Sequence, residues 1–242
     1  MQAWLLYSSF QMLPVAGNIL LMPVLPELAL QRTTSLRDQA LTAIRHALVT
    51  GQLAPGEVYS AAAIAAELGV SNSPVREAML ALVDDGLMES VPNRGYRPVT
   101  LSAADMAEIV QLRRFLEVPA VGLAAEAGPG DRLDKLQELV TVIEQTAAGG
   151  DLGGNLDADR EFHLTVTGIC GNRRLVGQVA RLRDQTRLYN LRNLAASGAL
   201  ATSAAEHRPL LAAIAARDRA AAEGLMEAHL AHLTTDWAAS EP

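Results

Sequence analysis

The sequence predicts a mainly α-helical protein in two parts: a small helical part that ends in a β-hairpin, and a larger all-helical bundle. Apolar residues recur at three- and four-residue steps through most of residues 35–240. An alternating stretch interrupted by a turn occurs at residues 87–99, and no strand pattern follows residue 102. The composition agrees, because 50% hydrophobic and 19% charged residues exclude a disordered or low-complexity chain.

Charge and cysteine content limit the partners and the compartment. The net charge is -7, of which -2 falls in residues 1–100 and -5 in residues 101–242. Neither part is basic, so any affinity for DNA must come from the local placement of arginines. The one cysteine, Cys170, excludes an internal disulfide and a CxxC pair. We therefore expect a reducing, cytoplasmic setting.

The amino-terminal segment has an unusual composition. Residues 1–26 carry no charged side chain and are long enough to span a membrane. Three prolines interrupt them, however, and no lysine or arginine precedes the apolar stretch. We expect residues 1–34 to be an extension that is disordered or not translated, with Met12 or Met22 as alternative starts. Membrane association is the less favoured alternative.

Three helices are predicted in the first part. The first follows Ser35 as N-cap and ends before Gly51, and the second begins near Ser60 and stops at Gly69. The third starts close behind, with Ser73 as its predicted cap. Two helices with so tight a connection form a helix-turn-helix, which presents the start of its second helix to the major groove of DNA.

The alternating stretch completes this domain. Residues 87–99 predict a hairpin with Arg94 and Arg97 near its tip. Gly95 would let a phosphate approach the backbone closely, and the arginines would reach the DNA backbone or minor groove. A helix-turn-helix followed by a hairpin is a winged helix, so residues 35–100 predict a DNA-binding domain.

The remaining chain, residues 101–242, predicts a bundle of six or seven helices. The glycine-rich stretch 149–154 is expected to be a flexible connector, because it lacks the Lys-Ser/Thr of a phosphate-binding loop. The predicted helical segments are 102–127, 130–148, 156–170, 172–193, 201–217 and 218–240.

The candidate metal ligands of this bundle are mostly histidines. Asp159 and His163 lie one helical turn apart and so project from one face, and His207 and His229 lie on later helices. Such a set could converge on one internal ion with positions left open for water or a ligand. The alternative for each histidine is an ordinary surface or hydrogen-bonded core residue.

Residues 35–100 contain a series of short motifs in a characteristic order and spacing. They are Leu53-Ala54-Pro55-Gly56, Leu68-Gly69-Val70-Ser71, Ser73-Pro74-Val75-Arg76-Glu77-Ala78 and Asn93-Arg94-Gly95-Tyr96. With these motifs, residues 35–100 resemble the winged-helix domain of GntR-type bacterial transcription regulators. Where that family usually has arginines, this chain has Ala62 and Asn72, which implies an altered operator preference. The alternative is a winged helix that has lost DNA binding. The expected DNA contacts are Ser71, Asn72, Ser73, Arg76, Arg94 and Gly95.

Five segments of the predicted bundle carry a second resemblance. They are Glu108-Ile109-Val110-Gln111-Leu112-Arg113, Phe115-Leu116-Glu117, Asp159-Arg160-Glu161-Phe162-His163, Glu206-His207 and Met226-Glu227-Ala228-His229-Leu230. With these segments, the bundle resembles the effector-binding FCD domain of the FadR branch of that family. The resemblance implies a divalent ion, with zinc the first expectation, held by Asp159, His163, His207 and His229. It also implies that Arg113 binds an effector, and a guanidinium pairs well with a carboxylate. The alternative for Arg113 is a salt bridge to Glu117 one turn on.

The predicted function is that of a metabolite-responsive transcription regulator. A small carboxylate effector would bind in the bundle and change binding of a double-stranded DNA operator by a homodimer. We expect no catalytic residues, because no glutamate is placed as a general base over the ion. A metal-dependent hydrolase or hydratase is the alternative, and a membrane-tethered regulator is a third. Ligand types alone leave zinc, nickel, manganese and iron open.

Overall fold

The computed structural model describes residues 35–197 and 199–238. The elements below belong to one compact unit, residues 34–242. The expectations for residues 1–34 fall outside the described residues. No helix in the described part of the chain combines the length and the apolar character needed to cross a membrane. Within the described ranges, side chains are not described at Val49, 188–197, 199 and 232–238.

Three helices open the fold: α1 (Leu36–Val49), α2 (Ala61–Leu68) and α3 (Asn72–Asp84). The first two begin after the serines predicted to cap them, and each serine hydroxyl accepts a hydrogen bond from the backbone three residues on. Gly69 ends α2 with φ +67°, a left-handed conformation that glycine adopts without strain. The local sequence therefore determines these helix ends.

The prediction that Ser73 caps α3 is wrong. Ser71 is the N-cap, and the helix begins at Asn72, two residues earlier than the prediction requires. Ser73 lies inside the first turn, and its hydroxyl lies 3.3 Å from a carboxylate oxygen of Glu77. Pro74 is compatible with either start, because the first turn of a helix has no intrahelical partner for a backbone N–H.

The predicted wing is present as an antiparallel hairpin of β1 (Met88–Val91) and β2 (Gly95–Pro98). Tyr59 adds a bridge to it, because the backbones of Tyr59 and Tyr96 exchange hydrogen bonds of 2.8 and 2.9 Å. A Cβ atom at Gly95 would lie 2.3 Å from the Tyr59 carbonyl oxygen. Glycine is therefore needed here for the close approach of the chain to itself, and not only for an approach to phosphate.

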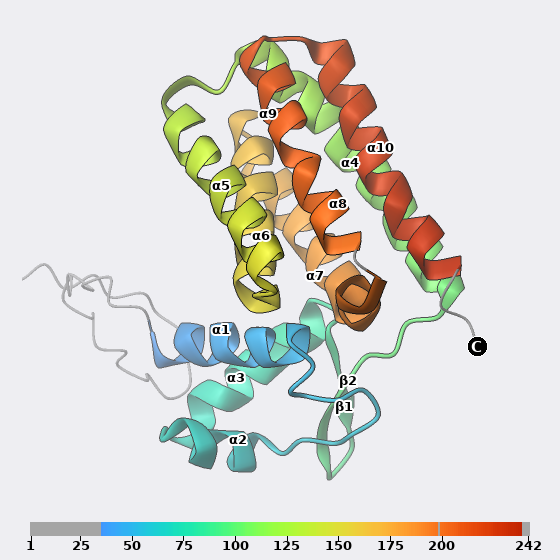
Figure 1. Cartoon of the computed structure of the whole chain (residues 1–242). Coiled ribbons are helices and arrows are strands. Elements are labelled where there is room, and N and C mark those ends of the chain that lie inside the picture. The colour runs from blue at the N-terminus through green and yellow to red at the C-terminus, as the bar shows by residue number, and fades with distance from the viewer. Residues whose placement is uncertain (1–34, 198, 239–242) are drawn as a thin grey trace, which may run out of the picture. The chain divides into compact units, whose positions relative to one another are not determined.

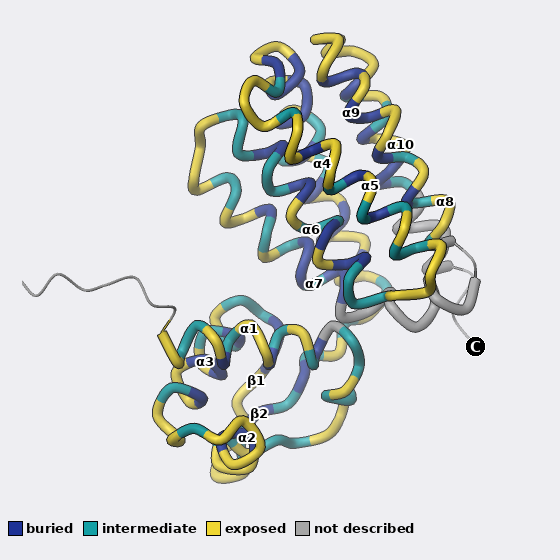
Figure 2. The backbone as a smooth tube through the Cα atoms, turned by 60° about the vertical axis from the view of Figure 1, so that its left-hand side comes forward, coloured by how far each residue is buried: buried dark blue, intermediate teal, exposed yellow. Residues whose placement is uncertain are grey.

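A small core joins these elements (Figure 2). Val75, Met79 and Leu82 of α3 are fully buried, as their spacing predicts. The same apolar spacing includes Leu36 and Leu68, but these two side chains are exposed, at 53% and 39%, because they lie at helix ends. The core residues are Ala40, Ile44, Leu48, Ile64, Ala65, Val75, Ala78, Met79, Leu82, Leu87, Met88 and Tyr96.

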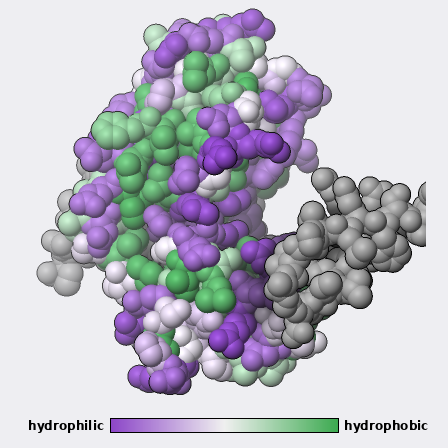
Figure 3. All heavy atoms as spheres, turned by 180° about the vertical axis from the view of Figure 1, so that it is seen from behind, coloured by the Kyte–Doolittle hydropathy of each residue, from purple (hydrophilic) through white to green (hydrophobic). Residues whose placement is uncertain are grey.

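An all-helical bundle follows, so the predicted mainly α fold is confirmed (Figure 1). The helices α4 and α10 run side by side, and α5 packs along α6. Seen from behind, apolar side chains gather over part of the bundle surface (Figure 3). The described elements are α4 (Ala103–Ala127), a 3-10 turn (Gly130–Arg132), α5 (Leu133–Gly149), α6 (Leu152–Ile169), α7 (Arg173–Ser197), α8 (Ala199–Ala205), α9 (His207–Ala215) and α10 (Arg219–Ala238).

Two predicted boundaries in the bundle are wrong. The expected connector 149–154 is partly helical, because Asp151 caps α6 by accepting a 3.0 Å hydrogen bond from the Gly154 backbone. A Cβ at Gly154 would lie 2.4 Å from the same carboxylate, so this glycine makes the cap possible. The helix expected over 201–217 is divided at Glu206 into α8 and α9.

The core of the bundle surrounds the predicted metal ligands. Phe162 is fully buried, and its ring packs edge-on against the imidazoles of His163 and His207 at 5.3 and 5.1 Å between centroids. Such contacts fix the ring planes of the histidines. The core residues are Val121, Ala124, Ala125, Leu136, Val140, Ile143, Ala158, Phe162, Val166, Ala204, Leu210, Leu211, Ala213, Ile214, Ala222, Met226 and Leu230.

Candidate functional site

Four side chains able to bind a metal meet inside the bundle. Asp159 and His163 lie one turn apart on α6, His207 begins α9, and His229 lies on α10. One ligand atom of each lies within 4.8 Å of those of the other three. The three imidazoles are buried, and Asp159 is half-buried. The structure thus brings together the four residues that the sequence predicts as ligands.

The outer nitrogens of two rings are held by hydrogen bonds. His207 Nδ1 lies 3.0 Å from the Ser203 carbonyl oxygen, and His229 Nδ1 lies 2.7 Å from Glu206 Oε2. His163 Nδ1 has no hydrogen-bond partner among the described residues, and its nearest carboxylate is Glu117, at 3.8 Å. In His207 and His229, these contacts leave Nε2 as the nitrogen available to an ion.

The same contacts indicate where the ring protons lie. Carbonyl and carboxylate oxygens only accept hydrogen bonds, so Nδ1 of His207 and His229 donates. In the neutral rings Nε2 then carries a lone pair. His207 Nε2 nevertheless lies 3.1 Å from Asp159 Oδ1 and 3.1 Å from His163 Nε2. A cation bound between Asp159 Oδ1 and His207 Nε2 would relieve the repulsion between the lone pairs of these two atoms.

The spacing of the donor atoms suits a small divalent ion. Zinc binds nitrogen and oxygen at about 2.0–2.1 Å, so tetrahedral ligands lie about 3.3 Å apart. The two contacts of 3.1 Å and the 3.6 Å separation of His163 Nε2 from Asp159 Oδ1 are close to that value. Three imidazoles and one carboxylate also form a donor set typical of zinc and related ions. The residues present therefore fit the metal that the family resemblance implies.

A buried network of arginines and carboxylates adjoins the histidines. Arg113 donates to Glu117 Oε1 at 2.6 Å, and Arg183 donates to Glu117 Oε2 at 2.7 Å. The second Nη atom of Arg183 donates to Asp159 Oδ2 at 2.7 Å, and Arg187 also contacts Asp159 Oδ2. These bonds occupy Oδ2 of Asp159 and leave Oδ1 directed at His207.

Burial and neighbouring charges set the protonation states. Desolvation lowers the pKa of both His163 and His229, that of His163 well below its usual value, so both rings are neutral near pH 7. Burial alone would raise the pKa of the Asp159 carboxyl, but the positive charges of Arg183 and Arg187 outweigh burial and hold that pKa well below its usual value. Asp159, His163 and His229 are therefore in the deprotonated form that metal binding requires.

Of the two roles weighed for Arg113, the structure shows the salt bridge to Glu117. Both side chains are almost fully buried, and Arg113 also donates to Thr186 Oγ1 at 3.1 Å. The sequence reasoning missed Arg183 and Arg187. Their four-residue spacing places them on one face of a helix, and this spacing is the sequence feature from which a paired role could have been predicted. Their carboxylate partners come from other helices and could not be paired from spacing alone.

The predicted DNA contacts lie at the start of α3 and on the wing. Ser71, Asn72, Ser73 and Arg76 are exposed in the first turns of α3. The backbone N–H groups of this turn lack intrahelical partners and can face a phosphate. The start of α3 is therefore open to a ligand.

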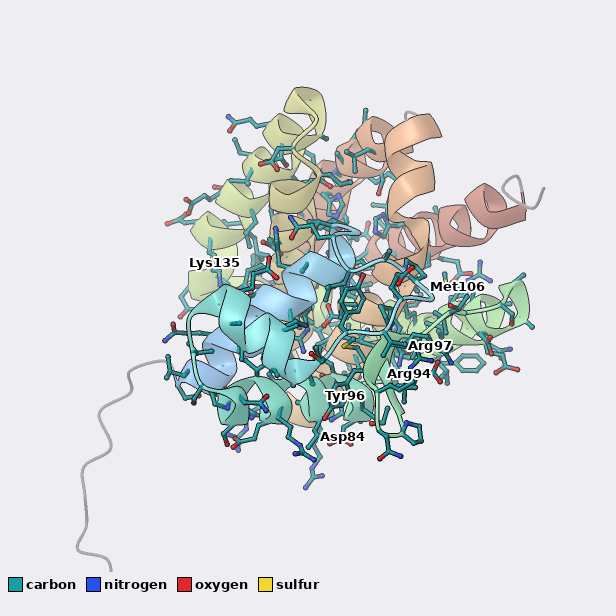
Figure 4. All side chains as sticks on the ribbon, turned by 90° about the horizontal axis from the view of Figure 1, so that it is seen from below. Asp84, Arg94, Tyr96, Arg97, Met106 and Lys135 are labelled. Atoms are coloured by element: carbon teal, nitrogen blue, oxygen red, sulfur yellow. The ribbon has the colours of Figure 1, made fainter. Side chains whose placement is uncertain are left out.

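The wing carries two arginines with different contacts (Figure 4). Arg94 is exposed beside Gly95 at the turn. Arg97 instead forms a 2.6 Å ion pair with Glu89 on the opposite strand. Of the two, Arg94 is the better placed to reach a phosphate.

A winged helix joined to an all-helical domain is the architecture of one class of bacterial transcription regulators. Residues 36–97 match the model of bacterial regulatory proteins of the gntR family, and residues 108–232 match the FCD domain. The chain belongs to the GntR family, in the FadR-type branch that carries an FCD domain. It is a DNA-binding regulator and not an enzyme.

Relatives and a solved structure agree with this assignment. The chain is 30% identical over 205 residues to the HTH-type transcriptional regulator LutR of Bacillus subtilis, a match that covers 76% of this chain and 92% of LutR. It is 31% identical to the Escherichia coli regulator McbR, over 59% of this chain and 64% of that protein. The structure of E. coli McbR/YncC superposes with a TM-score of 0.75 at 27% identity and covers 85% of this chain and all of that one.

Proposed function

We propose that this regulator senses a small anionic metabolite at a metal centre in the bundle and changes its affinity for an operator in response. The observation that supports the proposal most is the convergence of Asp159 Oδ1 with ring nitrogens of three buried histidines. An effector acts only through different affinities for the DNA-competent and DNA-incompetent states of the protein.

In this proposal Asp159, His163, His207 and His229 hold a divalent ion, with zinc the first candidate. A bound divalent ion supplies a positive charge and coordination sites for oxygen ligands. The chain's own residues prepare the site: burial keeps His163 and His229 neutral, and Arg183 and Arg187 fix Asp159 in its charged form. The metal is proposed from these contacts and from the donor set.

The charge of the site favours an anion as effector. Arg113, Arg183 and Arg187 are balanced by the carboxylates of Glu117, Asp159 and Asp184, so a divalent ion would give the site an excess of positive charge. Buried positive charge is costly unless it is paired, so an anionic ligand would bind favourably. A carboxylate fits best, because it can pair with a guanidinium fork and also bind a metal. Arg113 is the proposed contact. On effector binding, its guanidinium would leave the salt bridge to Glu117 and pair with the carboxylate of the effector.

The proposed DNA interface consists of the exposed start of α3 and the wing. Arg76 and Asn72 would contact base edges, because residues early in a recognition helix enter the major groove. Ser71, Ser73, Arg94 and Gly95 would contact the backbone. Two such helices are needed to read half-sites about 34 Å apart, so the functional species is a homodimer. We place it in the cytoplasm, where its DNA is.

Two measurements on the untagged protein test this function. The first is elemental analysis, for which we expect one divalent ion per chain. The second is a gel shift with the DNA upstream of its own gene at two salt concentrations, where binding should weaken as salt increases. A metal-free protein whose DNA binding is intact would contradict the sensing site. A metalloprotein that fails to bind any DNA upstream of its own gene would contradict the operator assignment.

A further inference from the structure

The break between α8 and α9 places a carboxylate, Glu206, directly before a candidate metal ligand, His207. Helix α8 ends at Ala205 and α9 begins at His207, with Glu206 between them. His207 is directed into the cluster, whereas Glu206 Oε2 lies 2.7 Å from Nδ1 of His229, which belongs to α10. One short segment thus provides one candidate ligand and contacts the back of another.

We propose that Glu206 is a positioning residue of the metal centre, which sets the orientation and tautomer of His229. This inference rests on the metal site proposed above. By accepting a hydrogen from Nδ1, Glu206 leaves Nε2 of His229 unprotonated and directed at the other ligands. A carboxylate in this position also makes the imidazole a stronger donor to a metal.

A comparison of His207 with His229 shows why this contact matters at His229. Backbone carbonyls of Ser203 and Ala204 fix Nδ1 of His207, so that orientation is part of the helix itself. For His229 the described contact is a side chain from another element, which a substitution can remove. The ring of His229 is therefore the one whose orientation depends on a replaceable acid.

A purely structural role for Glu206 fits the contacts less well. Glu206 occupies the N-cap position of α9, but its side chain makes no capping hydrogen bond there. The carboxylate is directed at His229, where both side chains are mostly buried, at 24% and 9% exposure. Removing it should therefore affect metal binding more than helix formation.

The test compares zinc affinity of the full-length wild type, Glu206→Gln and Glu206→Ala, by competition with a chromophoric chelator. Glu161→Ala is the matched control, because Glu161 also lies within two residues of a candidate ligand but pairs with Lys135 at the surface. We expect zinc affinity to fall about 10- to 100-fold in Glu206→Ala, less in Glu206→Gln, whose amide oxygen still accepts, and not at all in the control. The visible absorption spectrum of the cobalt-substituted proteins should change in the same order.

The outcomes separate this inference from the function on which it rests. If wild type binds zinc and Glu206→Ala binds it equally tightly with the same cobalt spectrum, Glu206 has no positioning role while the metal centre stands. If the control loses as much affinity as Glu206→Ala, the effect is not specific and the inference is wrong. If wild type binds no metal, both proposals fail. If circular dichroism shows that Glu206→Ala does not fold, the zinc affinity and cobalt spectrum of Glu206→Gln are compared with those of wild type. Values equal to those of wild type would then contradict the inference.

Discussion

The Nε2 atoms of His163 and His207 lie 3.1 Å apart, although 44 positions separate the two residues in the sequence. The contact joins α6 to the start of α9 in the centre of the bundle. Both rings are also wedged against Phe162, so they cannot turn away from one another without disturbing the core. Metal binding and folding of this domain should therefore be coupled.

Replacing His163 with alanine tests that coupling. The variant should lose its bound metal, and the chelator EDTA should no longer change its melting temperature, because an ion bound only to the folded state stabilises that state. At a free metal concentration of 100 times Kd the stabilisation lost would be about 2.7 kcal/mol. Metal analysis and thermal melts with and without EDTA measure both effects. His46→Ala, an exposed histidine of α1, should behave as wild type.

Replacing Arg76 with alanine tests the DNA interface. Arg76 is exposed near the start of α3, and a guanidinium that reads a base edge contributes about 1–3 kcal/mol to specific binding. Operator affinity, measured by gel shift or fluorescence anisotropy, should fall accordingly, and discrimination at one base pair should relax. Arg132→Ala, an exposed arginine between α4 and α5, serves as control. Unchanged operator affinity in Arg76→Ala would contradict the assignment.

Much of the winged helix can be predicted because its signals are local. Serine caps, the left-handed Gly69 and the alternating hairpin each act over a few residues, and the structure contains all three. The start of α3 was misplaced because Ser71 and Ser73 both precede a permissible proline. There the choice of start depends on packing of the following helix and not on the cap residue alone.

The candidate site was predictable only in part. Asp159 and His163 share a helix face by spacing. For His207 and His229 the sequence pattern left a metal ligand and an ordinary histidine as alternatives, and the family resemblance favoured the ligand. The ion pairs that Arg183 makes with Glu117 and Asp159 connect three helices, and no local pattern specifies such a pairing. The early start of α6 was missed for a related reason, because a good cap compensates for two glycines of low helix propensity.

Replacing Glu117 with glutamine should destabilise the bundle strongly. The carboxylate is fully buried, and Arg113 and Arg183 overcome the effect of burial and hold its pKa below the usual value. The neutral amide would leave Arg113 without its anion and Arg183 with Asp159 alone, and breaking a buried pair in this way costs about 3–5 kcal/mol. Urea unfolding followed by circular dichroism measures the change. Glu144→Gln, which removes the anion of a surface pair with Arg208, should change stability far less.

The reactivity of Cys170 with iodoacetamide should depend on pH in a way that reports its burial. Burial raises the pKa of the thiol above its usual value, and the Sγ atom lies 3.1 Å from the Ala120 carbonyl oxygen. A raised pKa means that less of the reactive thiolate is present at any given pH, so the midpoint of the rate profile should lie above that of a free cysteine, about 8.5. Cys170 is the one cysteine of the chain, so total alkylation followed by mass spectrometry reports this site alone. In urea the midpoint should return to the free value. A folded-state midpoint at or below that of free cysteine would show that the thiol is solvated.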